Sequence, residues 1–249
     1  MKTEQKCFRG GSLSYVLLVL VAVFTLNPAD VFAQKSIAPK GFFYPGELNA
    51  GEFKSDVLLT LAKLPEDVVE EVNSFIYAPL LSYYGQVGLP YGFSVQGTAS
   101  SNYITFYFSV GPRWSYRTGR FAFAVGDDVA YVLGEMHDFD FASTAKGWIN
   151  HPHATVGYAF DKFMLTVMGE ATFITTFKQF ADDVEVSSDR NFLSSYSLGV
   201  FIEQPLWKDN YMTLGVKATF AKFYYPAWAA FPTWNRFHFM PEAIIGFIL

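Results

Sequence analysis

The chain has 249 residues, of which 51% are hydrophobic, 19% are aromatic and only 16% are charged, and its net charge is −5 at pH 7. High hydrophobicity and low charge exclude a disordered chain, and the acidic balance without a basic patch excludes the common form of nucleic-acid binder. A single cysteine excludes a disulfide framework and a zinc site built on cysteines.

The first 33 residues have the layout of a secretory signal peptide. Basic residues precede an uninterrupted apolar run over 15–26, and Val31-Phe32-Ala33 offers a cleavage site before Gln34. The run is shorter than the about 20 residues that a membrane-spanning helix needs. We therefore expect residues 1–33 to be removed and the exported chain to begin near Gln34.

Beyond this segment, apolar and polar residues alternate with a period of two. Over 103–114, for example, Phe106 and Phe108 fall on one face and Thr105 and Ser109 on the other. Segments of about 10 residues with this alternation are typical of transmembrane β-barrels, whose outward side chains face lipid. We predict eight such strands, over 91–99, 103–114, 119–134, 152–160, 163–173, 195–203, 212–220 and 237–249.

The predicted connections alternate in length, which fixes the direction of the strands. Turns near 117–119, 161–162 and 207–210 are short, whereas the connections over 135–151, 175–194 and 221–236 are long. Short periplasmic turns and long outer loops are typical of these barrels. The predicted fold class is therefore an all-β membrane protein, an eight-stranded antiparallel up-and-down transmembrane β-barrel over 90–249. The same alternation turns Asp127 towards lipid, a costly position at mid-depth.

Residues 90–249 resemble the small eight-stranded bacterial outer-membrane barrels, the group of the OmpA transmembrane domain, OmpX and OmpW. The resemblance is architectural and includes no family-specific motif. The final residues, Ile245-Gly246-Phe247-Ile248-Leu249, are similar to the terminal signal that the barrel-assembly machinery reads, although that signal ends in an aromatic residue. The resemblance implies a location in the outer membrane of a Gram-negative bacterium, with outer-membrane lipid and the assembly machinery as partners.

Residues 34–89 lack this alternation and are predicted to form a periplasmic segment. Pro65-Glu66-Asp67 opens a helical stretch, with proline in the first turn and acidic residues beside it. Apolar residues then recur at spacings of three and four until Pro79, which predicts an amphipathic helix. The helix either enters the lumen as a plug or binds a partner, or it lies across the periplasmic mouth or the membrane interface. We prefer the second interpretation, because side chains fill the lumen of an eight-stranded barrel.

The inward-facing polar residues of the predicted strands converge on one layer of the lumen. Because buried charges need partners, we predict that Lys217 bridges Glu242 on the adjacent strand, with Glu170 across the lumen as a second candidate, and that Arg113 pairs with Glu203 lower down. We interpret the layer as a device that keeps the barrel shut; a proton or ion path is the alternative. The predicted cluster is Lys217, Glu242, Glu170, Asp128, Arg113, Glu203 and His153.

The last long connection is unusually aromatic for an outer loop. It is either a patch that binds a partner or an apolar ligand, or an aromatic rim that rests in the outer leaflet. The predicted patch consists of Tyr224, Tyr225, Trp228, Phe231 and Trp234.

Candidate chemistry is sparse. His151 and His153 share a strand face, but no third metal ligand is evident, so we predict no metal site and no cofactor. Ser187, Ser188 and Asp189 have no histidine close in sequence to form a nucleophilic site, and we predict no enzyme activity. Two functions remain: a closed structural or interaction barrel that acts through its outer loops, or a narrow channel for small or apolar solutes. A lipid-modifying enzyme is a distant third, and the sequence names no specific protein or ligand.

Overall fold

The computed structural model describes the chain from residue 41 to residue 248 with short gaps. The described residues are 41–65, 77–138, 141–181, 184–207, 210–229 and 236–248. The predicted signal peptide, the start at Gln34 and nearly all of the predicted amphipathic helix lie outside these residues and stay predictions. Within the described ranges, no helix is long and apolar enough to cross a membrane.

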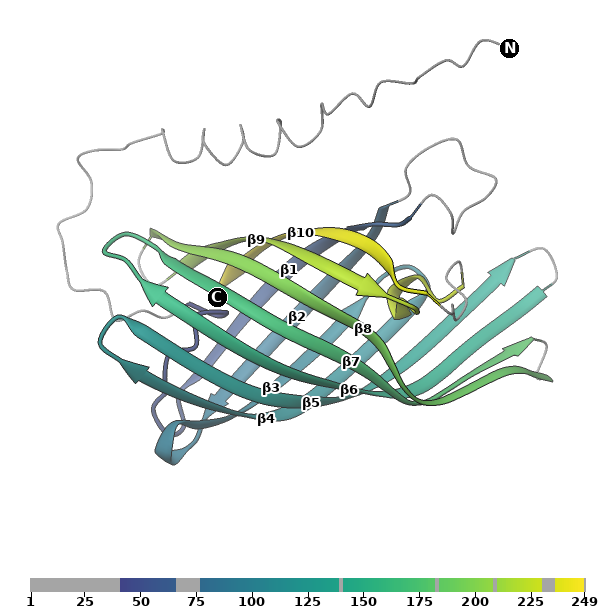
Figure 1. The fold of residues 1–249 in the computed structure, drawn as a ribbon, viewed down its shortest axis with the longest axis horizontal. Helices are drawn as coiled ribbons and strands as arrows, with labels where there is room; N and C mark the ends of the chain where they lie inside the picture. The colour runs from purple at the N-terminus through teal and green to yellow at the C-terminus, as the bar shows by residue number, and fades with distance from the viewer. Residues whose placement is uncertain are drawn as a thin grey trace, which may run out of the picture. The chain divides into compact units, whose positions relative to one another are not determined.

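Ten antiparallel strands close into one barrel, each paired with its neighbours in sequence, and the first strand is paired with the last (Figure 1). Such closure leaves no sheet edge around the ring. The strands are β1 (Phe53–Lys63), β2 (Tyr77–Gly88), β3 (Phe93–Ser101), β4 (Thr105–Thr118), β5 (Phe121–Asp138), β6 (Phe141–Ala159), β7 (Met164–Ala181), β8 (Val184–Trp207), β9 (Asn210–Ala221) and β10 (His238–Ile248), with short 3-10 helices η2 (Pro90–Gly92) and η3 (Tyr225–Ala227).

The prediction of eight strands is wrong, because β1 and β2 come from the segment that was predicted to be periplasmic. β1 closes the ring by pairing with β10 over Asp56–Ala62. The inward residues Leu58 and Leu80 are apolar and only 1% and 7% exposed, so apolar side chains occupy both faces and the period of two is lost. Pro79, the predicted helix end, lies on the outer face of β2.

Strands β5 to β8 project beyond the other strands at one end of the barrel (Figure 1). β8 has 24 residues, against 11 in β1 and 11 in β10. The long loops predicted over 135–151 and 175–194 are therefore wrong for the most part, because these residues continue the strand ladders. We call this the long-strand end, and the opposite end, with its tight turns, the short-turn end.

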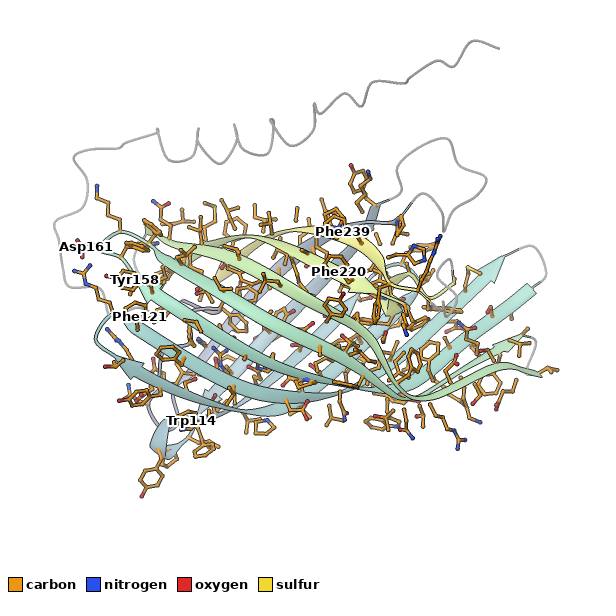
Figure 2. All side chains as sticks on the ribbon, viewed as in Figure 1. Trp114, Phe121, Tyr158, Asp161, Phe220 and Phe239 are labelled. Carbon is orange, nitrogen blue, oxygen red and sulfur yellow. The ribbon has the colours of Figure 1, made fainter. Side chains whose placement is uncertain are left out.

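The outer surface of the barrel is apolar. Along β10, buried and exposed residues alternate without a break, and the outward Phe239 and Phe247 are 53% and 45% exposed. Asp127 is also exposed on the outer face of a continuous β5, as the alternation predicted. Aromatic side chains stand on this surface towards both ends (Figure 2), an arrangement typical of membrane-spanning barrels. Those labelled are Trp114, Phe121, Tyr158, Phe220 and Phe239.

Candidate functional site: a chamber in the lumen

The residues that precede β1 fill the lumen at the short-turn end. We call Gly41–Pro45 the floor segment. Tyr44 is 0% exposed and Phe42 4% exposed. The ring of Phe43 stacks on that of Phe201 in β8, with centroids 3.8 Å apart and 7° between the planes. The floor segment and the inward residues around it thus form one hydrophobic cluster.

Two charged side chains from the barrel wall hold the floor segment. Glu203 is 0% exposed, and its carboxylate accepts hydrogen bonds from the backbone N–H groups of Phe43 and Tyr44 at 2.9 and 2.7 Å. Lys54 donates to the carbonyl of Gly41 at 2.8 Å. These contacts satisfy three buried backbone groups of the floor segment, which would otherwise be costly to bury, so the segment is held inside the barrel.

The connection between β9 and β10 folds into the lumen at the long-strand end. We call residues 222–229 the roof loop. The side chain of Asn102 donates to the carbonyl of Pro226 at 2.5 Å, and the indole N–H of Trp228 donates to the carbonyl of Ile104 at 3.4 Å. Trp228 lies against Gly134 of β5, where a Cβ atom would collide with its indole ring.

The predicted aromatic patch is therefore neither an exposed binding patch of an outer loop nor a rim in the outer leaflet, as far as its described residues show. Trp228 is 2% exposed and Tyr224 is 8% exposed, and Tyr225 stacks on Tyr107 of β4 with centroids 4.9 Å apart. These three residues point into the barrel because the roof loop turns inward. Burial raises the pKa of the Tyr224 and Tyr225 hydroxyls well above the ordinary value, so both stay neutral. Phe231 and Trp234 lie outside the described residues.

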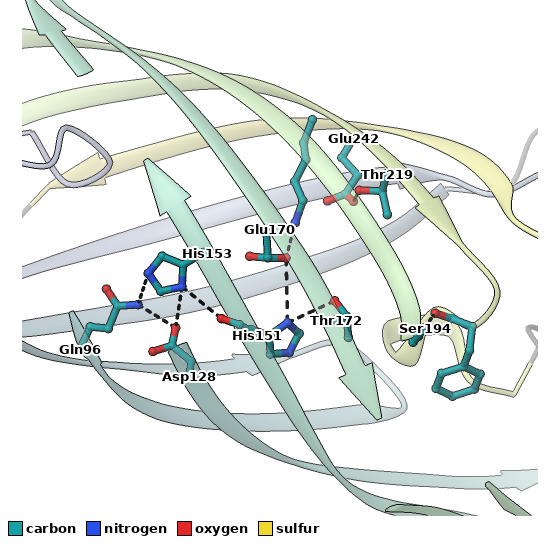
Figure 3. Close-up of polar contacts among 11 residues, drawn as sticks. Gln96, Asp128, His151, His153, Glu170, Thr172, Ser194, Thr219 and Glu242 are labelled. Atoms are coloured by element: carbon teal, nitrogen blue, oxygen red, sulfur yellow. Dashed lines mark hydrogen bonds and ion pairs between the residues drawn. The ribbon is translucent and has the colours of Figure 1, made fainter. Parts of the chain in front are cut away.

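Between the floor segment and the roof loop lies a chamber of about 120 Å³. Phe43 and Phe201 line it from the floor, and Phe223, Tyr224 and Tyr225 line it from the roof. Polar residues of the wall line the middle, and Figure 3 shows several of them projecting from different strands towards one another. The chamber-lining polar residues include Ser82, Ser100, Ser109, Asp128, His151, Glu170, Thr172, Lys217, Thr219 and Glu242.

The central charged residues of the predicted cluster do converge on this chamber. Lys217 of β9 forms an ion pair with Glu170 of β7, with 3.1 Å between the ammonium nitrogen and a carboxylate oxygen. Glu242 faces Lys217 in the register of β9 and β10, as predicted. However, the carboxylate of Glu242 accepts a short hydrogen bond from Thr219, so the ion pair goes to Glu170, the second candidate.

A second polar group joins β3, β5 and β6 (Figure 3). The amide of Gln96 donates to a carboxylate oxygen of Asp128 at 2.7 Å, and His153 lies with its Nδ1 4.0 Å from the same oxygen. His151, on the same strand face, has its Nδ1 3.2 Å from the Thr172 hydroxyl and 4.0 Å from Glu170.

The predicted pair of Arg113 with Glu203 is wrong. Glu203 is occupied by the floor segment, and its carboxylate forms no ion pair among the described residues. Arg113 is 5% exposed, and its charge and that of Glu203 attract each other without forming an ion pair among the described residues. The sequence does not show that the floor segment enters the lumen, so the carboxylate of Glu203 was paired with Arg113, an inward-facing cation.

The described residues contain no group of three or more His, Cys, Asp and Glu side chains that could hold a metal ion. The paired histidines instead make separate contacts within the polar lining. The floor segment is the feature that sequence analysis missed. The sequence feature that could have indicated it is the aromatic run Phe42-Phe43-Tyr44 before the first strand. These aromatic residues are not part of a strand, so they cannot face lipid from one.

Comparisons with known proteins give architecture alone. No family model matches the chain, and no curated protein sequence matches it. Among solved structures, Neisserial surface protein A is similar with a TM-score of 0.40 and 9% identity, covering 79% of this chain and 96% of the other. The KdgM porin follows with a TM-score of 0.37, 8% identity, and 78% and 97% covered.

A third similar structure is the translocator domain of the autotransporter NalP from Neisseria meningitidis, with a TM-score of 0.36 and 9% identity, covering 81% of this chain and 88% of that domain. Scores and identities this low transfer no function. The architecture of this chain is established by its own closed strand pairing.

Proposed function

We propose that this protein is an outer-membrane β-barrel that is closed in this conformation and acts through its projecting strands, not as an open pore. An apolar outside, a polar lumen and full strand closure suit a bilayer, because every backbone group in the ring finds its partner within the sheet. The projection of β5 to β8 at one end supports an orientation with the short-turn end in the periplasm, because barrels of this kind extend further on the outer side.

The observation that carries the closed state is the filling of the lumen at both ends. At the short-turn end, Phe43 stacks on Phe201 and its backbone N–H donates to Glu203. At the other end, Asn102 and Tyr107 contact the roof loop. A lumen filled by the chain's own segments leaves no continuous aqueous path, as in other small barrels that are packed inside.

The projecting parts of β5 to β8 are then the surface left to meet a partner. Among the described residues, β8 pairs with β9 only from Ser195 onward, so residues 184–193 form a strand edge at the long-strand end. Exposed Val184 and Val186 alternate there with polar residues. The projecting strands and this exposed edge support the interpretation of a barrel that binds a partner over that of a purely structural barrel.

A second candidate function is a gated conduit for small solutes. One observation favours it: the chamber lies between two closures that belong to connecting segments rather than to the barrel wall. The two functions are distinguished by solute flux into proteoliposomes that contain the chain from Gln34 onward or a variant that begins at Gly46. A closed barrel keeps both forms impermeable because the roof loop remains, whereas a conduit gated at the floor admits solute in the shortened form. Flux through the complete chain would overturn the proposed function.

A further inference from the structure

Three buried polar atoms on one side of the chamber have no hydrogen-bond partner. They are the hydroxyl oxygen of Ser109, one carboxylate oxygen of Asp128 and Nε2 of His151, and all three residues line the chamber. The residues lie on the adjacent strands β4, β5 and β6, and Asp128 and His151 face each other in register. Other such atoms, among them those of Asp56, Gln86 and Thr166, lie outside the chamber lining. Because each buried polar atom needs a partner, three around one chamber mark a place for a ligand.

The unpartnered atoms call for a ligand that donates hydrogen bonds. Asp128 already receives Gln96 at its other oxygen, and the Nδ1 of His151, which is 6% exposed, contacts Thr172. The remaining carboxylate oxygen is an acceptor, and the hydroxyl oxygen and the ring nitrogen can each accept. An alkylammonium group has three N–H donors and no acceptor, so it matches the three atoms in number and kind.

The charge of the lining favours a cation as well. Asp128, Glu170 and Glu242 contribute three carboxylates, whereas Lys217 is the one lysine or arginine that lines the chamber. Lys217 is engaged by Glu170, and Glu242 is hydrogen-bonded by a neutral hydroxyl. His153, 4.0 Å from Asp128, is the other titratable group beside that carboxylate. The carboxylates that line the chamber therefore outnumber its lysine and arginine side chains, which favours a positively charged ligand.

The size and the apolar part of the chamber define the rest of the ligand. About 120 Å³ holds roughly eight to twelve water-sized positions, since each needs about 10–15 Å³. The rings of Tyr107 and Tyr225 lie stacked beside the polar atoms, and aromatic faces attract cations and cover alkyl groups. We propose that the chamber binds a small organic ammonium ion whose N–H groups donate to Ser109, Asp128 and His151.

The test uses three probes of similar size and different charge: n-butylammonium chloride, n-butanol and sodium butyrate. A ligand that binds the folded protein and not the unfolded chain raises the urea unfolding midpoint, and the rise grows with the logarithm of its concentration above Kd. We expect n-butylammonium to raise the midpoint of the refolded chain more than sodium chloride at equal ionic strength does, and the alcohol and the carboxylate to have no such effect. Equal shifts with all three probes, or none with n-butylammonium, would overturn the proposal.

Two variants locate the binding. Asp128→Asn removes the charge and should weaken n-butylammonium binding by about tenfold, the loss expected for one charge-assisted hydrogen bond. Asp127→Asn is the matched control, because this neighbour lies on the outer face of the same strand; it should bind as the unaltered chain does. His151→Phe keeps a ring beside Tyr107 and removes the acceptor nitrogen, so it serves if Asp128→Asn does not fold. Equal affinity in all variants would place the ion elsewhere and refute the site.

Discussion

Glu203 is the residue whose replacement tests the floor segment most sharply. Its carboxylate accepts two backbone N–H groups, at 2.9 and 2.7 Å, from a segment far away in sequence. Glu203→Gln preserves size but offers one acceptor oxygen, and it turns an NH2 group towards the second backbone N–H. One buried donor is then unsatisfied, which costs about 1–3 kcal/mol, and the remaining hydrogen bond loses its ionic part. The neutral amide is easier to bury than a carboxylate, which offsets some of this loss.

The net expectation is a loss of roughly 1–3 kcal/mol in the free energy of unfolding, measured by urea titration in small vesicles. Chymotrypsin should also cleave faster within the floor segment, after Phe42 or Phe43, because weaker attachment exposes the backbone more often. Glu185→Gln is the matched control: it lies in the same strand, its pair with Lys178 is 35% and 41% exposed, and such pairs contribute about 0–1 kcal/mol. The reasoning is refuted if both variants unfold alike and the protease finds no new site.

Three further substitutions test the lumen. Lys217→Met should destabilise the barrel by roughly 3–5 kcal/mol because it leaves a buried carboxylate unpaired, whereas Lys178→Met, at an exposed pair, should change little in the same urea titration. Gly215→Ala places a methyl group against the phenylalanine ring that stacks on the floor segment and should cost about 1–3 kcal/mol; Gly169→Ala, with open space at its Cβ, should be tolerated. Asn102→Ala removes a hydrogen bond to the roof loop and should raise protease cleavage after Trp228, and unchanged cleavage would contradict that attachment.

Most of the wall could be predicted because lipid imposes a rule on it. Strands such as β4 and β9 carry apolar residues on the lipid side and mainly polar or small ones inside, so the period of two is visible in the sequence and the registers follow. Lys217 and Glu242 are adjacent in the structure for that reason. The rule fails on β1 and β2, where inward Leu58 and Leu80 are also apolar.

The contents of the lumen could not be predicted, because they depend on contacts between segments far apart in the chain. Phe43 is buried through Phe201 and Glu203, and nothing near it in sequence announces that partner. The roof loop reads as an exposed aromatic patch for the same reason: its burial depends on the space above Gly134 and on the ring of Tyr107. Lys217, Glu170 and Glu242 line one chamber, whereas the partner of Glu203 is the floor segment.

The filled lumen is tested most directly by the reactivity of a single cysteine inside the chamber. Cys7 is the sole cysteine of the sequence, so a chain that begins at Gln34 has no background reaction. Ser82→Cys is a near-isosteric change at a chamber-lining residue that is 2% exposed, and Ser188→Cys lies exposed on the projecting part of β8. A charged methanethiosulfonate reagent is added on both sides of the membrane. We predict that Ser82→Cys reacts at least about a hundredfold more slowly than Ser188→Cys. This is the ratio expected when opening of the closures costs about 2.8 kcal/mol or more, at roughly 1.4 kcal/mol per tenfold. Equal rates at the two positions would show an open lumen and contradict it.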